Sequence, residues 1–482
     1  MRTRTFCALL VAVLTSLAAC APEETGTLAA ATRVLGANEM QSIEYTGTGK
    51  WFQFGQAPNP TLPWPPFDVT SFQASINYET SIARVQMTRK QVVESGRVRP
   101  APVEQRPVQI VNGRYSWNLV SSSPQPQPET AEERAMEIWT TPHGFLRAAN
   151  ANNATSQPVE GGSEVSFTMD GKYRYVGRIN ASSQVERVQT WIDNTVTGDT
   201  AVEITYSDYR DFGGVLFPGR IVRTQGGYPV LDITVSGVTA NATVDIGVPA
   251  AVRDFKPPAV TVEVEKLANG VYYLKGGSHH SLAIDQRDHI IIVEAPQNEA
   301  RSEAVIAKAK ETIPNKPIRY IVNTHVHFDH SGGLRTYVAE GATVVTHAMN
   351  RPYYEQVWAA PRTLNPDRLA RAKATANFET FTDKYVLTDG RRVVEVYAIA
   401  GSGHNDAYAM VYLPAERILA QVDAYAAPAP NAPAAAAPSP FAVNLYDNIE
   451  RLKLNVRQIA PLHGPGTATL ADLRTAVGRT SS

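Results

Sequence analysis

The sequence lacks an excess of charge of either sign. Its 45 lysine and arginine residues stand against 46 aspartate and glutamate residues, for a formal net charge of -1. A protein with this balance has no long-range field that would gather nucleic acid or anionic lipid. We therefore expect no nucleic-acid partner, and we expect the partners to be small or neutral molecules.

The apolar run at the N-terminus is too short to span a membrane. It covers Phe6 to Leu14, whereas a membrane-spanning helix needs about 20 apolar residues. Arg2 and Arg4 precede the run and small residues follow it, which is the order found in secretory signals. We expect residues 1–19 to be a signal peptide that is removed.

Cysteine is nearly absent, since Cys7 and Cys20 are the only two in the chain. Leu17-Ala18-Ala19-Cys20 resembles the bacterial lipobox, in which the cysteine is lipidated and becomes the new N-terminus. This resemblance implies a mature chain without an internal disulfide, anchored to the membrane by lipid on Cys20. Ala21 is not the aspartate of inner-membrane retention, so the resemblance favours the cell envelope, at an outer membrane and facing the periplasm. The alternatives are an ordinary signal cut elsewhere and a short transmembrane helix.

A chain of 482 residues is too long for one hydrophobic core, because single cores stop growing near roughly 250 to 300 residues. We divide it into a disordered tether (20–33), a β-rich N-terminal domain (34–257) and a second domain (258–482). The tether is assigned because its residues are small and polar, with no regular spacing of apolar residues. The boundary between the two domains is placed where the sequence pattern changes, after Pro257-Pro258.

The N-terminal domain shows short alternating runs typical of antiparallel strands. Examples are Phe72–Tyr78, Val165–Met169 and Ala201–Tyr206. We expect no amphipathic helix of three turns to interrupt them, and no catalytic constellation occurs here. The stretch Tyr206 to Pro218 resembles a strand-turn-strand of half-barrel lipoprotein-carrier folds. The domain is therefore predicted to be either such a half-barrel or a generic antiparallel β domain.

In the second domain, β-rich runs alternate with helical patterns, which indicates α/β layers. Asn298 to Ile313 is predicted to be a helix. Leu445, Ile449, Leu452, Val456 and Ile459 form one apolar stripe, which predicts a second helix. Between that helix and the preceding strand, Ala426 to Pro440 is almost entirely alanine, proline and serine, and we expect a mobile flap there.

Four metal-binding side chains fall within six positions after the predicted strand Ile318–Asn323. They are His325, His327, Asp329 and His330. Alternation on a turn places the first two on one side and the last two on the other, so one loop can hold two adjacent metals. Imidazole and carboxylate suit divalent ions of the zinc type. Two such ions roughly 3.5 to 4 Å apart can hold a bridging hydroxide at neutral pH.

Further metal-binding side chains follow other predicted strands. His404 lies between a strand ending near Ile399 and the strand 408–413. Asp423 ends the apolar run that begins at Ile418, and His463 follows a short strand after the second helix. The sequence thus offers seven candidate ligands.

The order and context of these segments resemble the metallo-β-lactamase-fold superfamily over roughly residues 260 to 475. The resemblance implies an αββα sandwich in a two-domain α+β chain, and two divalent ions with zinc as the expected metal. It implies that His325, His327 and His404 hold one ion, that Asp329, His330 and His463 hold the other, and that Asp423 bridges them. Asp329 or Asp423 is the expected catalytic residue that orients the reactants or accepts a proton. Five histidines match no ligand position: His143, His279, His280, His289 and His347, of which His279 and His280 are candidates for the mouth of the site.

Two positions depart from the family pattern. Glu294 ends a strand that often ends in aspartate, and Asn405 follows His404 where threonine or serine is common. Both are expected to contact ligands and to tune the metals without binding them.

The function expected from this resemblance is hydrolysis of an ester, thioester, lactone or similar small substrate by a metal-bound hydroxide. β-Lactam hydrolysis is disfavoured because true β-lactamases of the superfamily carry cysteine or serine in place of Asp423. One alternative is a mononuclear iron sulfur dioxygenase-like enzyme. The other is a non-catalytic envelope binding or assembly lipoprotein.

Overall fold

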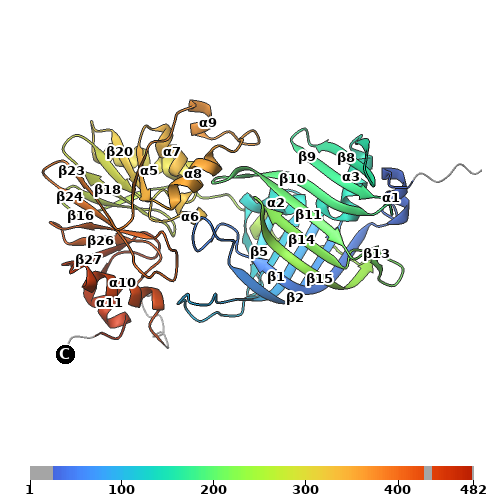
Figure 1. The fold of residues 1–482 in the computed structure, drawn as a ribbon, viewed down its shortest axis with the longest axis horizontal. Helices are drawn as coiled ribbons and strands as arrows, with labels where there is room; N and C mark the ends of the chain where they lie inside the picture. Colours follow the sequence, from blue (N-terminus) through green and yellow to red (C-terminus); the bar gives the residue numbers. More distant parts are fainter. Residues whose placement is uncertain (1–24, 428–436, 480–482) are drawn as a thin grey trace, which may run out of the picture.

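The computed structural model describes residues 25–427 and 437–479. The predicted signal peptide, Cys20 and the middle of the predicted flap lie outside these ranges. No helix in the described ranges combines the length and the apolar composition needed to cross a bilayer. Figure 1 shows the N-terminal and C-terminal halves side by side, each with its own β-sheets.

The N-terminal half is built on one large antiparallel sheet, as the sequence predicts. In the described ranges the sheet has thirteen strands, in the order β6-β5-β4-β3-β2-β1-β15-β14-β11-β10-β9-β8-β7. The strands are β1 (Ser42–Phe52), β2 (Pro66–Asn77), β3 (Ile82–Gln91), β4 (Val108–Asn112), β5 (Tyr115–Val120), β6 (Ser123–Pro126), β7 (Thr155–Val159), β8 (Gly162–Met169), β9 (Tyr173–Asn180), β10 (Val185–Asn194), β11 (Gly198–Ser207), β14 (Arg220–Gln225) and β15 (Tyr228–Ala240). The strand-turn-strand expected near residues 206–218 is a separate hairpin of β12 (Arg210–Asp211) and β13 (Leu216–Phe217).

Two helices that are not predicted from the sequence join the opposite edges of the sheet. α2 (Ala131–Thr140) and α3 (Pro142–Ala151) lie between edge strands β6 and β7 in the chain. Thr141 caps α3 by accepting a hydrogen bond from Gly144 N, and Pro142 occupies its first turn. These are ordinary helix-start signals. Met136, Ile138, Phe145 and Leu146 are buried and pack into one core with the sheet.

The prediction of a disordered tether over residues 20–33 is wrong for its second half. α1 (Leu28–Val34) occupies residues expected to be disordered. Ala31 is fully buried in the same core as α3, and His143 Nε2 donates a hydrogen bond to Leu35 O (2.9 Å). Small alanine side chains, which are equally typical of a spacer, allow this helix to pack closely.

The C-terminal half is the expected sandwich of two sheets between helices. The first sheet has the strand order β16-β17-β18-β19-β20-β21-β22 and the second β23-β24-β25-β26-β27-β28. Their bounds are β16 (Glu263–Ala268), β17 (Val271–Lys275), β18 (Ser281–Asp285), β19 (Ile290–Val293), β20 (Ile318–Val322), β21 (Thr343–His347), β22 (Phe378–Phe381), β23 (Lys384–Thr388), β24 (Val393–Ala398), β25 (Ala409–Leu413), β26 (Ile418–Gln421), β27 (Gln458–Pro461) and β28 (Ala468–Thr469). A short helix, α4 (Ala250–Arg253), precedes them.

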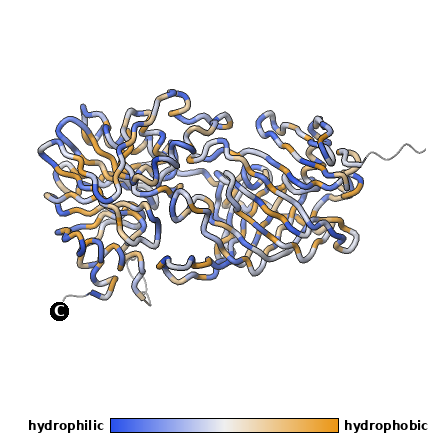
Figure 2. The backbone as a smooth tube through the Cα atoms, viewed as in Figure 1, coloured by the Kyte–Doolittle hydropathy of each residue, from blue (hydrophilic) through white to orange (hydrophobic). Residues whose placement is uncertain are grey.

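Apolar side chains fill the layers of this sandwich. Residues such as Val293 and Val411, from different sheets, share one core. Helices α5 (Glu299–Thr312) and α7 (Leu334–Ala339) pack on the outer face of the first sheet through Val305 and Leu334. Figure 2 shows the hydrophobic stretches following the strands in both halves.

The remaining helices are α6 (Phe328–Ser331), α8 (Asn350–Trp358), α9 (Arg368–Ala372), α10 (Pro440–Arg451) and α11 (Leu470–Ala476). α10 is the second predicted helix, but it ends eight residues before Ile459, which lies on β27. Lys453 adopts a positive φ of 56° two residues after the helix. The apolar stripe in the sequence therefore combines a helix face with a strand.

Candidate metal centre

The seven predicted ligands lie where strands of both C-terminal sheets end. The first four follow β20, which ends at Val322, and two of them lie on the short helix α6. His404 lies between β24 and β25, while Asp423 and His463 follow the parallel neighbours β26 and β27. The close approach of the α6 turn to its surroundings requires glycine at position 332, where a Cβ would lie 2.0 Å from Gln297 O.

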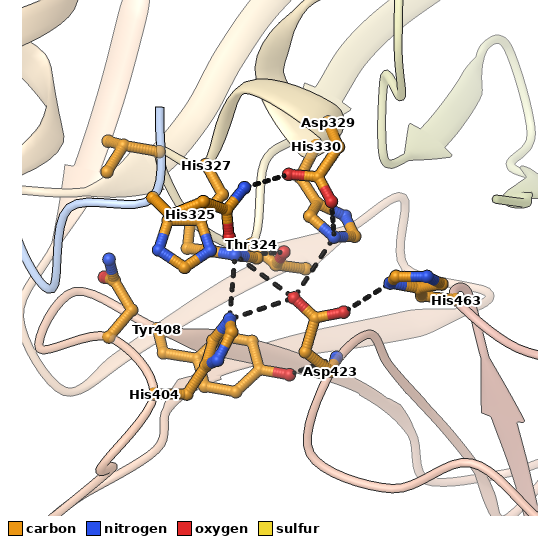
Figure 3. A network of polar contacts seen from close by, with 12 residues as sticks. Thr324, His325, His327, Asp329, His330, His404, Tyr408, Asp423 and His463 are labelled. Atoms are coloured by element: carbon orange, nitrogen blue, oxygen red, sulfur yellow. Dashed lines mark hydrogen bonds and ion pairs between the residues drawn. The ribbon is translucent and has the colours of Figure 1, made fainter. Parts of the chain in front are cut away.

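The structure brings these side chains into two adjacent groups, each of which can hold a metal ion. One contains His325, His327, His404 and Asp423, and the other contains His279, Asp329, His330 and His463. Within each group, the potential ligand atoms lie within 4.8 Å of one another. The four side chains of the His-x-His-x-Asp-His segment thus divide between the groups as their alternation predicts (Figure 3).

Asp423 lies between the two groups. Its Oδ2 is 2.9 Å from His404 Nε2 and 3.1 Å from His330 Nε2. Its Oδ1 is 2.7 Å from His463 Nδ1. Burial raises the pKa of Asp423, but the charge of His330 and the hydrogen bonds from the surrounding imidazoles outweigh it and hold that pKa well below its usual value. The residue is therefore an ionised carboxylate whose Oδ2 lies between ligands of both groups and whose Oδ1 faces the second group.

Two buried imidazole nitrogens of the candidate ligands have no hydrogen-bond partner among the described residues. They are His327 Nδ1 and His330 Nε2. Burial holds the pKa of His327 well below its usual value and lowers that of His325 to about 4, so both rings are neutral. The neutral ring of His327, with its free Nδ1, is costly to leave unpaired and is the form that binds zinc-type ions. Burial lowers the pKa of His330, but Asp423 and Glu294 outweigh it and hold that pKa well above its usual value. The residues present therefore fit divalent metals.

Glu294 contacts a candidate ligand, as its position after β19 suggests. Its Oε2 accepts a hydrogen bond from His330 Nδ1 (2.8 Å), which leaves Nε2 of that ring facing Asp423. Its Oε1 accepts from Thr324 N (2.8 Å) at the start of the ligand segment. Carboxylates in this position fix the orientation of a metal-binding histidine.

His279 is a candidate ligand outside the set of seven predicted from the sequence. Its Nε2 lies 3.3 Å from Asp329 Oδ2, and its ring stacks on His463 with centroids 3.9 Å apart. It is 7% exposed. Its position after Gly276-Gly277 was the only sequence feature that pointed to the site. His280 instead contacts Gly464 O through Nε2 (2.8 Å), and neither His143, His289 nor His347 belongs to either group.

Part of the C-terminal half is similar to known proteins. Residues 274–420 match the family model described as the metallo-beta-lactamase superfamily. No curated protein matches the chain. Among solved structures, a metallo-beta-lactamase from Pontibacter korlensis is 19% identical, with a TM-score of 0.34, and the match covers 45% of this chain and 98% of that one.

Two further solved structures are similar to the same extent. The metallo-beta-lactamase FIM-1 from Pseudomonas aeruginosa in the mono-zinc form is 19% identical, with a TM-score of 0.35, over 46% of this chain and 96% of its own. A metallo beta lactamase from Hirschia baltica is 20% identical, with a TM-score of 0.34, over 45% of this chain and 96% of its own. Residues 274–420 of this chain are thus similar to the metallo-beta-lactamase superfamily, in agreement with the sandwich fold of the C-terminal half.

Proposed function

We propose that this protein is a metal-dependent hydrolase that holds two divalent ions, with zinc as the native metal. The observation that carries the proposal is the position of Asp423, whose carboxylate lies between the two groups, with His404 of the first and His330 and His463 of the second all within 3.1 Å of its oxygens. A carboxylate between two ions offsets their mutual repulsion. Two adjacent sites, rather than one, are therefore the arrangement that these side chains favour.

The roles follow from the geometry. His325, His327 and His404 would hold the first ion, Asp329, His330 and His463 the second, and Asp423 would contact both. When bound, such ions supply Lewis acidity, which polarises a carbonyl and makes water a competent nucleophile at neutral pH. Asp329 is 34% exposed in its side chain, so it is accessible to orient a reactant or accept a proton.

We propose an ester, thioester, lactone or similar small molecule as the substrate. The aspartate at position 423 supports this choice over a β-lactam, since superfamily β-lactamases usually have cysteine or serine there. The N-terminal segment that ends at Cys20 supports a lipid-anchored location in the cell envelope, at an outer membrane facing the periplasm. The convergence of Asp329, His330 and His463 disfavours a mononuclear dioxygenase, in which these three side chains would have no role.

The proposal is tested with a Cys20→Ser protein purified without lipid. Metal analysis after dialysis is expected to give about two zinc ions per chain, the occupancy of a two-metal site. The same sample is then assayed on lactones, thioesters, simple esters, phosphodiesters and β-lactams. Turnover of the first three classes supports the proposal. A protein that binds no metal, or one that binds iron and oxidises thiols without hydrolysing any ester, contradicts it.

A further inference from the structure

A loop of the N-terminal domain contacts candidate ligands of the metal centre. The β1–β2 loop (residues 53–65) connects two central strands of the large sheet. In Figure 1 this blue segment extends from the N-terminal half to α6, the helix that carries two of the candidate ligands. Ala57 and Asn59 of the loop are buried although they lie between strands.

The loop fixes the ring of His327. His327 Nε2 donates a hydrogen bond to Ala57 O (3.0 Å). With a proton on Nε2, the neutral ring carries its lone pair on Nδ1, which is the buried nitrogen without a partner among the described residues. The backbone of another domain thus selects the tautomer that can bind the first ion. A hydrogen bond to the second nitrogen of a metal-binding histidine is the usual means of setting its orientation.

The loop also contacts a candidate ligand of the second group. Gln56 Nε2 donates a hydrogen bond to Asp329 Oδ1 (2.8 Å). The other carboxylate oxygen, Oδ2, faces the second group, 3.3 Å from His279 Nε2 and 3.5 Å from His330 Nε2. The amide therefore holds Asp329 with one oxygen toward the loop and one toward the candidate ion.

Several contacts hold the loop against the ligand segments. Phe328 N donates to Gly55 O (3.1 Å), and Asp406 N donates to Pro58 O (2.8 Å). Asn405, next to His404, donates from Nδ2 to the same Ala57 O (3.0 Å) that His327 contacts. Phe54 packs edge to face against Phe328, with ring centroids 5.1 Å apart. The loop is thus anchored on both sides of the first group.

We propose that the β1–β2 loop is a structural part of the metal centre, with Gln56 and the Ala57 carbonyl as positioning groups for Asp329 and His327. This inference rests on the proposed function, because it assigns the loop a role toward the same two ions. The inference assigns the N-terminal domain a role that the sequence does not indicate. Through this loop, the domain contacts and orients ligands that belong to the other domain.

The first test compares Gln56→Ala with Gln53→Ala in the full chain. Gln53 lies on the same loop, and its side chain makes no hydrogen bond among the described residues. Zinc affinity is measured by competition with a chelator, and the cobalt-substituted proteins are compared by visible absorption. We expect Gln56→Ala to bind the second ion about 10-fold more weakly or worse, in the range usual for groups that contact metal ligands, with an altered cobalt spectrum. Gln53→Ala should match the wild type in both.

The second test moves the loop backbone. Gly55 has a φ of 80°, and a Cβ there would lie 2.7 Å from the Phe328 ring. Gly96 has the same φ of 80°, but a Cβ at that position would meet nothing within 4 Å. Gly55→Ala and Gly96→Ala therefore carry the same backbone strain, and only the first displaces the loop from α6. We expect Gly55→Ala to bind both ions more weakly than the wild type does. Gly96→Ala should bind them as strongly as the wild type.

The outcomes separate this inference from the proposed function. If the wild type binds two ions and Gln56→Ala and Gly55→Ala bind them with unchanged affinity and spectrum, the loop has no positioning role while the hydrolase proposal stands. If the wild type binds no ion, both fail. A loss of affinity accompanied by an equal loss in Gln53→Ala or Gly96→Ala would indicate general destabilisation and would also overturn the inference.

Discussion

Asp423 is the residue on which the two-ion arrangement depends. Asp423→Asn keeps the volume of the side chain but removes the charge that lies 2.9 Å from His404 and 2.7 Å from His463. We expect the wild type to retain about two ions after dialysis, Asp423→Asn one or fewer, and His463→Ala close to one. Metal analysis of the dialysed proteins measures this directly.

The matched control is Asp447→Asn, which removes a carboxylate that is 57% exposed on α10. Its metal content should equal that of the wild type. An Asp423→Asn protein that keeps both ions and most of its activity would show that the carboxylate does not bridge.

We expect His143 to make the stability of the N-terminal domain sensitive to acid. It is fully buried, and burial lowers its pKa to about 4 in the folded protein, against about 6.5 when unfolded. The folded state therefore binds fewer protons, so the stability contribution is complete above pH 6.5 and falls as the pH drops toward 4. The loss by pH 4 is roughly 3 kcal/mol.

His143→Gln removes the titrating group and keeps an amide that can reach Leu35 O. We expect this variant to lose less stability than the wild type between pH 7 and pH 4.5, as measured by urea unfolding at both values. Parallel curves for the two proteins would rule out His143 as the source of the acid sensitivity.

At the scale of residues, the sequence predicts much of the site. The short helix α6 carries Asp329 and His330 and separates them from His325 and His327, which precede it. His404, Asp423 and His463 could be found because each follows a strand. His279 could not, since it lies just before β18 with no ligand spacing around it. Its place in the second group comes from stacking on His463, 184 residues away in the chain.

At the scale of elements, strands were easier to predict than helices. Alternating polar and apolar residues identify strands such as β2 and β11, because one face of each packs on the core. α1, α2 and α3 are not predicted from the sequence because each has ten residues or fewer, too few for a helical pattern to repeat. The end of α10 at Arg451 was missed because the following residues continue the apolar pattern on a strand.

The packing of α3 against the sheet depends on a glycine in β9. A Cβ at Gly177 would lie 2.1 Å from the ring of Phe145, which is fully buried. We expect Gly177→Ala to reduce the free energy of unfolding by about 1 to 3 kcal/mol, as overpacking of a core does. Urea unfolding measures the change.

Gly247→Ala provides the comparison for this effect, since nothing lies within 4 Å of a Cβ at that glycine. Its stability should stay within about 0.5 kcal/mol of the wild type. Equal effects of the two substitutions would mean that the contact between β9 and α3 is not tightly packed.

At the scale of the whole molecule, the two halves are also joined away from the metal centre. Asp199 of β11 accepts hydrogen bonds from Thr363 N (2.7 Å) and Leu364 N (3.2 Å). Arg362 donates to Val196 O (2.8 Å) and is 7% exposed. The β1–β2 loop and the ion pair between Arg97 and Asp406 (2.8 Å) also connect the halves.

Asp199→Ala should weaken the interaction between the two halves. We expect the unfolding transitions of the two halves to separate by about 2 to 4 °C for each kcal/mol by which the substitution weakens the interaction between them, as measured by calorimetry. Asp232→Ala removes a carboxylate that pairs with Arg220 within the N-terminal sheet, so it should leave the two transitions equally close. The same separation in both variants would contradict a role for Asp199 in joining the halves.

Contacts between the two halves could not be predicted from the sequence. The prolines between Pro58 and Pro66 indicate a loop, but nothing local shows that its carbonyl groups are buried beside His327. Burial of a loop backbone requires partners for its polar groups, and here the partners lie about three hundred residues further along the chain, as for Asn59 and Asp406.

The separation of 270 residues between Ala57 and His327 has a consequence for the order of folding. Every strand of the large sheet lies before residue 241, and the sheet is closed when β15 pairs with β1, up to Ala240 opposite Ile43, so the N-terminal domain can fold first as a unit. The β1–β2 loop then offers a preformed surface on which the ligand segments, from His325 to His463, complete their fold. We therefore expect metal binding to follow the folding of both halves.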